Sequence, residues 1–171
     1  LDSPPTAGTT FTRADTGEFR RDWQTGVAVI DAPRSQGAFG RLEDAGTVRT
    51  SDVSVRSETP FAAIVVTSMD GRPVRESRHL LVTAVGRAEN TGQVFNMTRT
   101  ELKQLGVGPI LVEPVTGRVT ISTNRDAFTA YALDADGTRR SLGERRALSD
   151  AITLDITQAS RTIYYELESV E

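Results

Sequence analysis

The sequence predicts an all-β protein, a jelly-roll-like β-sandwich of about a dozen strands. Short apolar or alternating runs, separated by turn-forming residues, fill most of its 171 residues. Two runs, residues 61–68 (FAAIVVTS) and 79–88 (HLLVTAVGRA), are apolar on both faces, as central strands of a packed sheet are. The 37% hydrophobic and 25% charged content is typical of a globular domain, and the length is sufficient for a sizeable core.

The domain organisation is predicted from changes in composition. Residues 1–10 (LDSPPTAGTT) are rich in Pro, Thr and Gly, which indicates a linker cut from a longer protein. Residues 11–171 are expected to form one β-sandwich domain. A subdomain boundary near residues 106–109 (GVGP) is the alternative, because the composition shifts there.

The first predicted element is a hairpin within residues 17–36. Alternation places Phe19 and Trp23 on the same side of its first strand, and Thr25-Gly26 turns the chain into an apolar strand at 27–30. Trp23, the only tryptophan, therefore has two interpretations: a ring that fills the core beside Phe19, or an exposed platform for a ligand.

The remaining strands are predicted from the same short runs. Asp70-Gly71 provides a turn between the two central runs, and residues 134–137 (DADG) mark a hairpin turn. Further strands are expected at 38–42, 47–56, 93–96, 109–113, 117–122, 127–133, 139–143, 151–156 and 161–168.

One short helix is predicted near 99–105. Thr98 and Glu101 have the spacing of a capping box, and the sequence RTELKQL has helical propensity. Gly106 then stands where a glycine ends many helices.

Composition and charge exclude several functions. A net charge of −3 argues against binding of a phosphate backbone, and no apolar run approaches the length of a membrane span. We therefore expect neither nucleic-acid nor membrane partners. Cysteine is absent and His79 is the only histidine, which excludes thiolate metal sites and disfavours a histidine-assisted triad. No cofactor is expected; a structural calcium ion stays an alternative, at no residue that the sequence identifies.

Carboxylates keep one catalytic alternative open. Glycoside hydrolysis needs two acids, and Glu89, Glu101 and Glu113 lie near the ends of predicted elements. A small all-β hydrolase or lyase that uses such carboxylates is thus an alternative function.

Three stretches resemble a region found after the catalytic barrel of bacterial glycoside-hydrolase-like proteins. Residues 14–42 share its Asp-Thr-Gly-Glu and Pro-Arg motifs, as Asp15-Thr16-Gly17-Glu18 and Pro33-Arg34. Residues 77–96 resemble its Gly-Arg-x-Glu-Asn-Thr-Gly segment, and residues 108–121 its Pro-Val-Leu-Val-Glu-Pro-Val segment. The aromatic residue and the acid of the first stretch occur here in the reverse order, as Asp22-Trp23.

The resemblance implies a non-catalytic, C-terminal β-sandwich of a carbohydrate-active enzyme, bacterial and secreted, periplasmic or on the cell surface. Its implied partners are a polysaccharide or oligosaccharide and the catalytic barrel of the same chain. The domain itself would not be an enzyme, and no binding residues are carried over.

Two roles follow for such an accessory domain. If it binds carbohydrate, Trp23 is the first candidate for ring stacking and Tyr131 the second, with Asp22, Arg20 and Asn90 as polar partners. The alternative is a structural module that packs against another domain through an exposed apolar patch.

Overall fold

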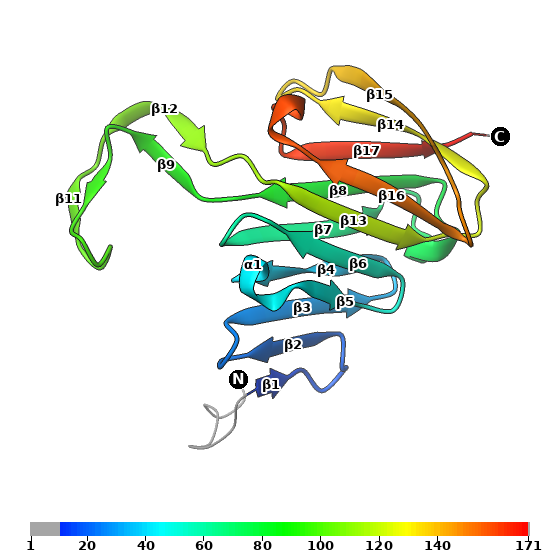
Figure 1. Ribbon diagram of the computed structural model, residues 1–171, viewed down its shortest axis with the longest axis horizontal. Coiled ribbons are helices and arrows are strands. Elements are labelled where there is room, and N and C mark those ends of the chain that lie inside the picture. Colours follow the sequence, from blue (N-terminus) through cyan, green and yellow to red (C-terminus); the bar gives the residue numbers. More distant parts are fainter. Residues whose placement is uncertain (1–10, 171) are drawn as a thin grey trace.

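The computed structural model describes residues 11–170 and confirms the all-β, sandwich-like fold (Figure 1). The larger layer is a nine-stranded antiparallel sheet. Its strands, in spatial order, are β1 (Phe11–Arg13), β2 (Phe19–Asp22), β3 (Val27–Ala32), β4 (Ser35–Gly40), β7 (Ala62–Ser68), β8 (His79–Val85), β17 (Tyr164–Ser169), β14 (Ala127–Leu133) and β15 (Arg139–Arg146).

A four-stranded sheet forms the second layer and covers one face of the first (Figure 1). Its order is β16 (Ala151–Ile156), β13 (Gly117–Ser122), β6 (Val53–Ser57) and β5 (Thr47–Arg49). Two two-stranded ribbons pair β9 (Ala88–Thr91) with β12 (Val107–Val112) and β10 (Val94–Phe95) with β11 (Leu102–Gln104). The helical elements are short: α1 (Leu42–Ala45) and the 3-10 turns η1 (Val74–Glu76) and η2 (Gln158–Ser160).

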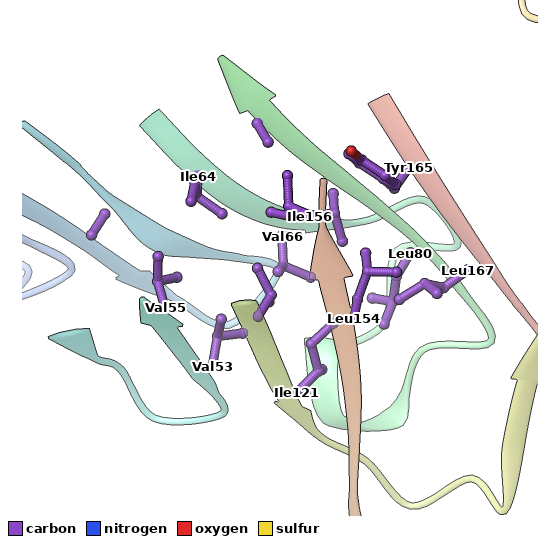
Figure 2. Close-up of a cluster of buried hydrophobic side chains, with 14 of the residues drawn as sticks. Val53, Val55, Ile64, Val66, Leu80, Ile121, Leu154, Ile156, Tyr165 and Leu167 are labelled. Atoms are coloured by element: carbon purple, nitrogen blue, oxygen red, sulfur yellow. The ribbon is translucent and has the colours of Figure 1, made fainter. Parts of the chain in front are cut away.

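The core lies between the two sheets and follows from strand alternation. Alternate residues of β7, β8 and β17 face inward, and they meet alternate residues of β6, β13 and β16 (Figure 2). The side chains labelled there are 2% exposed or less: Val53, Val55, Ile64, Val66, Leu80, Ile121, Leu154, Ile156, Tyr165 and Leu167.

The predicted central strands and hairpins are confirmed. Residues 61–68 and 79–88 contain β7 and β8, which are neighbours in the large sheet. Within 17–36, β2 and β3 pair around a turn in which Gly26 has a φ of +71°. Residues 134–137 connect β14 to β15. Because β8 and β14 lie in the same sheet, the chain before and after residues 106–109 builds one layer.

The helix predicted at 99–105 is wrong, since this segment forms a turn and then β11. Asn96 is the cause. Its side-chain oxygen accepts hydrogen bonds from the backbone amides of Thr100 and Glu101, so Asn96 rather than Thr98 organises the turn. Arg99 adopts a positive φ of 56°, which interrupts any helix.

The structure has seventeen strands within residues 11–170, against about a dozen predicted. The additional strands are short, such as β1 at the edge of the large sheet and β11. Runs of two or three residues show no alternation that a sequence can reveal.

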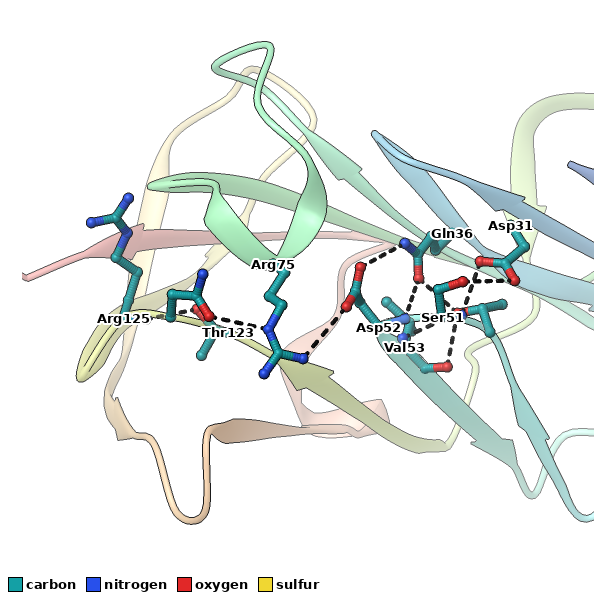
Figure 3. Close-up of polar contacts among 10 residues, drawn as sticks. Asp31, Gln36, Ser51, Asp52, Val53, Arg75, Thr123 and Arg125 are labelled. Atoms are coloured by element: carbon teal, nitrogen blue, oxygen red, sulfur yellow. Dashed lines mark hydrogen bonds and ion pairs between the residues drawn. The ribbon is translucent and has the colours of Figure 1, made fainter.

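A polar network ties the two sheets together at one end of the sandwich (Figure 3). The buried Gln36 of β4 donates to the carboxylate of Asp52 at 3.0 Å and accepts from the hydroxyl of Thr50 and the amide of Asp52. Arg75 contacts Asp52 at 3.8 Å and donates to Asn124 at 3.1 Å. These bonds satisfy buried polar groups and fix the turn between β5 and β6.

The face of the large sheet that turns away from the four-stranded sheet is called the outer face here. Strand register places Ile30, Phe39, Val65 and Thr83 on it, all partly exposed. In the described part of the chain, no second layer covers this face. This face is apolar over β3, β4 and β7, where Ile30, Phe39 and Val65 lie, and charged over β8, β17 and β15, where His79, Glu166 and Arg139 meet.

Candidate functional site: an apolar arm beside the sandwich

A long β-hairpin leaves the sandwich between β8 and β13 and projects away from it (Figure 1). We call residues 86–116 the arm. The arm contains both two-stranded ribbons, and the β9–β12 ribbon is the one nearer the sandwich. None of residues 88–112 belongs to the hydrophobic core. The arm is thus an appendage whose role lies outside the packing of the sandwich.

The arm carries most of its apolar side chains on its surface. All six residues of β12 are exposed. Eight of the arm's large apolar residues have exposed fractions between 40% and 102%: Val94, Met97, Leu102, Leu105, Val107, Ile110, Leu111 and Val112. Exposed apolar residues gathered on one segment indicate an interaction site.

Polar groups of the arm, in contrast, are satisfied within the arm. Asn90 donates from its side-chain amide to the carbonyl oxygen of Leu105 at 3.1 Å, and Thr91 donates to the carbonyl oxygen of Pro109 at 2.7 Å. Gly106 closes the bend with a φ of +74°, where a Cβ would lie 2.6 Å from the carbonyl oxygen of Thr91. Internal bonds therefore hold the arm in shape and leave its apolar side chains free for contact.

The charges of the arm also pair with one another. Glu89 bonds both Arg87, at 3.0 Å, and Arg99, and Lys103 contacts Glu101 at 2.7 Å. Arg87 further approaches Glu113 at 3.8 Å. With three basic and three acidic residues, the arm has no net charge. It therefore suits an uncharged partner surface.

A groove of about 710 Å³ lies where the arm meets the sandwich. One wall comes from β12 and the residues that follow it, including Ile110 and Val112. The other wall comes from the ends of β14 and β17 and the loops beside them: Leu133, Asp134, Ala135, Thr157, Gln158, Arg161, Thr162, Ile163 and Tyr164. Through Tyr164, which pairs with Thr83 across the sheet, the groove continues into the outer face.

Three of the candidate sugar-binding residues lie together at β2. Trp23 follows this strand with 46% of its surface exposed, so it does not fill the core. The guanidinium of Arg21 lies 3.8 Å from the centre of its ring, and its indole nitrogen donates to the Thr12 hydroxyl at 3.2 Å. Asp22 accepts bonds from the amides of Gln24 and Thr25, which lower its pKa against the opposing effect of burial.

Local bonds also occupy Arg20, the third candidate at β2. Its guanidinium donates to the backbone carbonyl of Arg49 in β5 at 3.3 Å and so connects the two sheets. The side chain of Asp22 stabilises the turn after β2, and the side chain of Arg20 connects the two sheets.

The structure does not bring Tyr131 and Asn90 to this cluster. Tyr131 belongs to β14, six strand positions from β2 in the large sheet, which corresponds to about 30 Å at the usual spacing. The guanidinium of Arg139 lies 5.0 Å from the centre of its ring. Asn90 belongs to β9, where it binds the bend of the arm. The five candidates therefore occupy three separate places.

Glu166 is a buried acid of the outer face, and two basic neighbours balance its negative charge. Glu166 is 7% exposed and contacts His79 Nε2 at 2.5 Å and Arg139 Nε at 2.6 Å. Burial alone would raise its pKa, but the bonds from Arg139 and His79 outweigh burial and lower the pKa. Glu166 is thus held as a carboxylate, which is unsuited to donating a proton at neutral pH.

The acids near the groove are similarly paired. Glu113 faces Arg87 at 3.8 Å, and Asp134 accepts a bond from Arg140 at 2.8 Å. Glu89 and Glu101 also bind basic residues of the arm. Across residues 11–170, no three His, Asp or Glu side chains gather to hold a metal, and no helix is long and apolar enough to cross a membrane.

Comparison with protein-family models, curated proteins and solved structures finds no match to this chain.

The arm is the feature that the sequence analysis did not identify. Residues 109–113 were expected to form a strand, and they do, but as part of the arm rather than of the sandwich. The sequence feature that indicates the arm is its composition: Gly106 precedes an apolar strand that contains Gly108 and Pro109. A free strand and a buried one look alike in sequence, because burial depends on what lies beside them.

Proposed function

We propose that this protein is a non-catalytic accessory β-sandwich that docks onto a neighbouring folded domain through the arm. The observation that carries the proposal is the exposure of eight large apolar residues on an arm with no net charge. A second uncovered apolar surface, at Ile30, Phe39 and Val65 of the outer face, supports it. The paired acids are consistent with a role without bond chemistry.

The resemblance of residues 14–42, 77–96 and 108–121 supplies the proposed partner. It is the catalytic barrel of a glycoside-hydrolase-like protein on the same polypeptide, in a bacterial protein that is secreted, periplasmic or on the cell surface. Interfaces between domains of one chain are commonly formed by such surface patches.

The test compares the arm in the longer polypeptide and in the isolated chain. We expect amide hydrogen exchange in residues 94–112 to be slow in the polypeptide that contains the barrel and fast in the isolated chain, because docking excludes water from the arm. Leu111→Lys should restore fast exchange in the longer polypeptide. Leu148→Lys is the matched control, since Leu148 is an exposed leucine outside the arm. Equal exchange in both forms, or a gene without a barrel, would contradict the proposal.

Carbohydrate binding at β2 is the second candidate function, and the exposure of Trp23 favours it. The ring can stack on a sugar while its nitrogen stays bonded to Thr12. Affinity electrophoresis with a panel of polysaccharides should then show retardation that Trp23→Ala removes and Tyr131→Ala leaves unchanged. Folded protein that no polysaccharide retards would eliminate this candidate.

A further inference from the structure

In the β9–β12 ribbon, the outer edge of β12 carries backbone groups that have no hydrogen-bond partner in the part of the chain that the structure describes. The amide of Glu113 donates to the carbonyl of Arg87 at 2.7 Å, which makes these residues a hydrogen-bonded pair. In an antiparallel ladder such pairs alternate with pairs whose backbone groups point outward. The register of Val112 with Ala88 and of Ile110 with Asn90 therefore directs the backbone groups of Ile110 and Val112 away from β9.

The opposite edge of the ribbon is partly filled. Gln93 accepts a bond from the amide of Asn90 through its side chain at 2.9 Å and donates its own amide to the carbonyl of Asn90 at 3.0 Å. Among the described residues, no group outside the ladder bonds the backbone of Ile110 or Val112. The β9 edge is thus capped at Asn90, and the stretch with two residues whose outward backbone groups have no partner within residues 11–170, Ile110 and Val112, lies on the free edge of β12.

The free edge lacks the devices that usually protect edges. Charged side chains, proline and bulges prevent edge pairing in soluble proteins. Pro109 and a bulge between Val107 and Ile110 protect the first half of β12. Ile110, Leu111 and Val112 have neither, and all three are exposed and uncharged.

The groove follows this same edge. It is lined by Ile110, Val112 and the residues after them, and by no residue of β9. Its far wall presents Leu133, Ile163 and Tyr164. Two polar groups beside these residues are engaged, since Asp134 binds Arg140 and the Thr162 hydroxyl donates to the carbonyl of Leu133, whereas Gln158 and Arg161 also line the groove. Open backbone groups and a partly apolar wall therefore face the same space.

We propose that the groove binds an extended, uncharged peptide segment of the partner protein, which adds a strand to β12 at Ile110–Val112. Backbone bonds to Ile110 and Val112 would hold the segment, and its alternate side chains would contact Leu133, Ile163 and Tyr164. This is strand addition, in which the main chain gives affinity and alternate pockets give specificity. The inference rests on the proposed docking function and names the part of the partner that the arm holds.

A single strand fits the groove better than other occupants. The groove borders one edge of β12 and no residue of β9, so a single strand is the element that can pair there. The arm of a second copy would bring its own β9 alongside its β12, and that ribbon would meet the far wall. A sugar would find one aromatic ring, Tyr164, in a groove whose Asp134 and Thr162 side chains are already bonded.

The experiment uses the isolated chain and a labelled, capped heptapeptide of alternating valine and threonine. We expect the peptide to shift the backbone amide resonances of Ile110 and Val112. N-methylation of two peptide amides that face β12 should weaken binding by about 30-fold, as loss of two net hydrogen bonds does. Val112→Lys should abolish binding, whereas Leu111→Lys should not, because Leu111 does not line the groove.

Three outcomes would overturn the inference. These are absence of shifts at the solubility limit of the peptide, equal binding of the N-methylated peptide, or dimerisation of the free chain that Val112→Lys removes. Shifts of the same resonances by oligosaccharides would assign the groove to sugar instead. Leu111→Lys separates the two proposals, since it should release the arm from a docked domain and leave peptide binding intact.

Discussion

Glu166 joins strands of the outer face more firmly than any surface ion pair could. Its carboxylate lies between His79 of β8 and Arg139 of β15, and the same guanidinium reaches Glu168 at 3.1 Å. Glu166 is nearly buried, whereas Glu168 is about half exposed. Exposed pairs contribute little to stability, but removal of one partner from a buried pair leaves the other unsatisfied.

Glu166→Gln should therefore destabilise the protein by about 2 kcal/mol at pH 7. Glu168→Gln, the matched control, should cost less than about 0.5 kcal/mol. The folded-state pKa of Glu166 lies below its unfolded value of about 4.3. Its stabilisation is thus present above that value and is lost as the pH falls through the folded pKa.

Urea unfolding at pH 7 and at pH 3.5, followed by circular dichroism, measures this prediction. The difference between wild type and Glu166→Gln should shrink at the lower pH. A difference that grows toward acid, or equal destabilisation by the two variants, would show that Glu166 is not held as a carboxylate.

At the scale of elements, the sequence predicts strands well wherever alternation runs for six or seven residues. Buried and partly exposed residues alternate along the whole of β8 and over the first six residues of β7, and these two strands pair as anticipated. Residues 99–105 are too short for such a pattern. There the side chain of Asn96 decides the conformation, although local propensity favours a helix.

The candidate site was less predictable than the strands for a physical reason. Residue type alone makes Trp23 and Tyr131 candidates, but their positions depend on strand order, which places five strands between β2 and β14. The arm is not recognisable in the sequence because Ile110, Leu111 and Val112 have the composition of a core strand. An apolar residue type indicates that burial of the side chain is favourable. Only the fold shows whether other residues of the same chain bury it.

At the scale of the molecule, the arm is not expected to contribute to the free energy of unfolding of the sandwich. The sandwich buries a continuous core from both sheets, and the arm adds nothing to it between residues 88 and 112. The two strands of the arm leave and re-enter through the hydrogen-bonded pair of Arg87 and Glu113. Such a pair can be closed by a two-residue turn, for which Asn-Gly is the preferred sequence.

Replacement of residues 88–112 by Asn-Gly should therefore leave the sandwich folded, with a free energy of unfolding within about 1 kcal/mol of the wild type, as for changes outside the core. Leu154→Ala, which opens a cavity at a residue only 1% exposed, should instead cost about 3 kcal/mol. Urea titration with tryptophan fluorescence measures both, because Trp23 lies outside the arm.

The shortened variant should also bind less of an apolar dye, since eight exposed apolar residues are removed. Unfolding of the shortened variant would mean that the arm stabilises the sandwich and is not a surface kept for a partner.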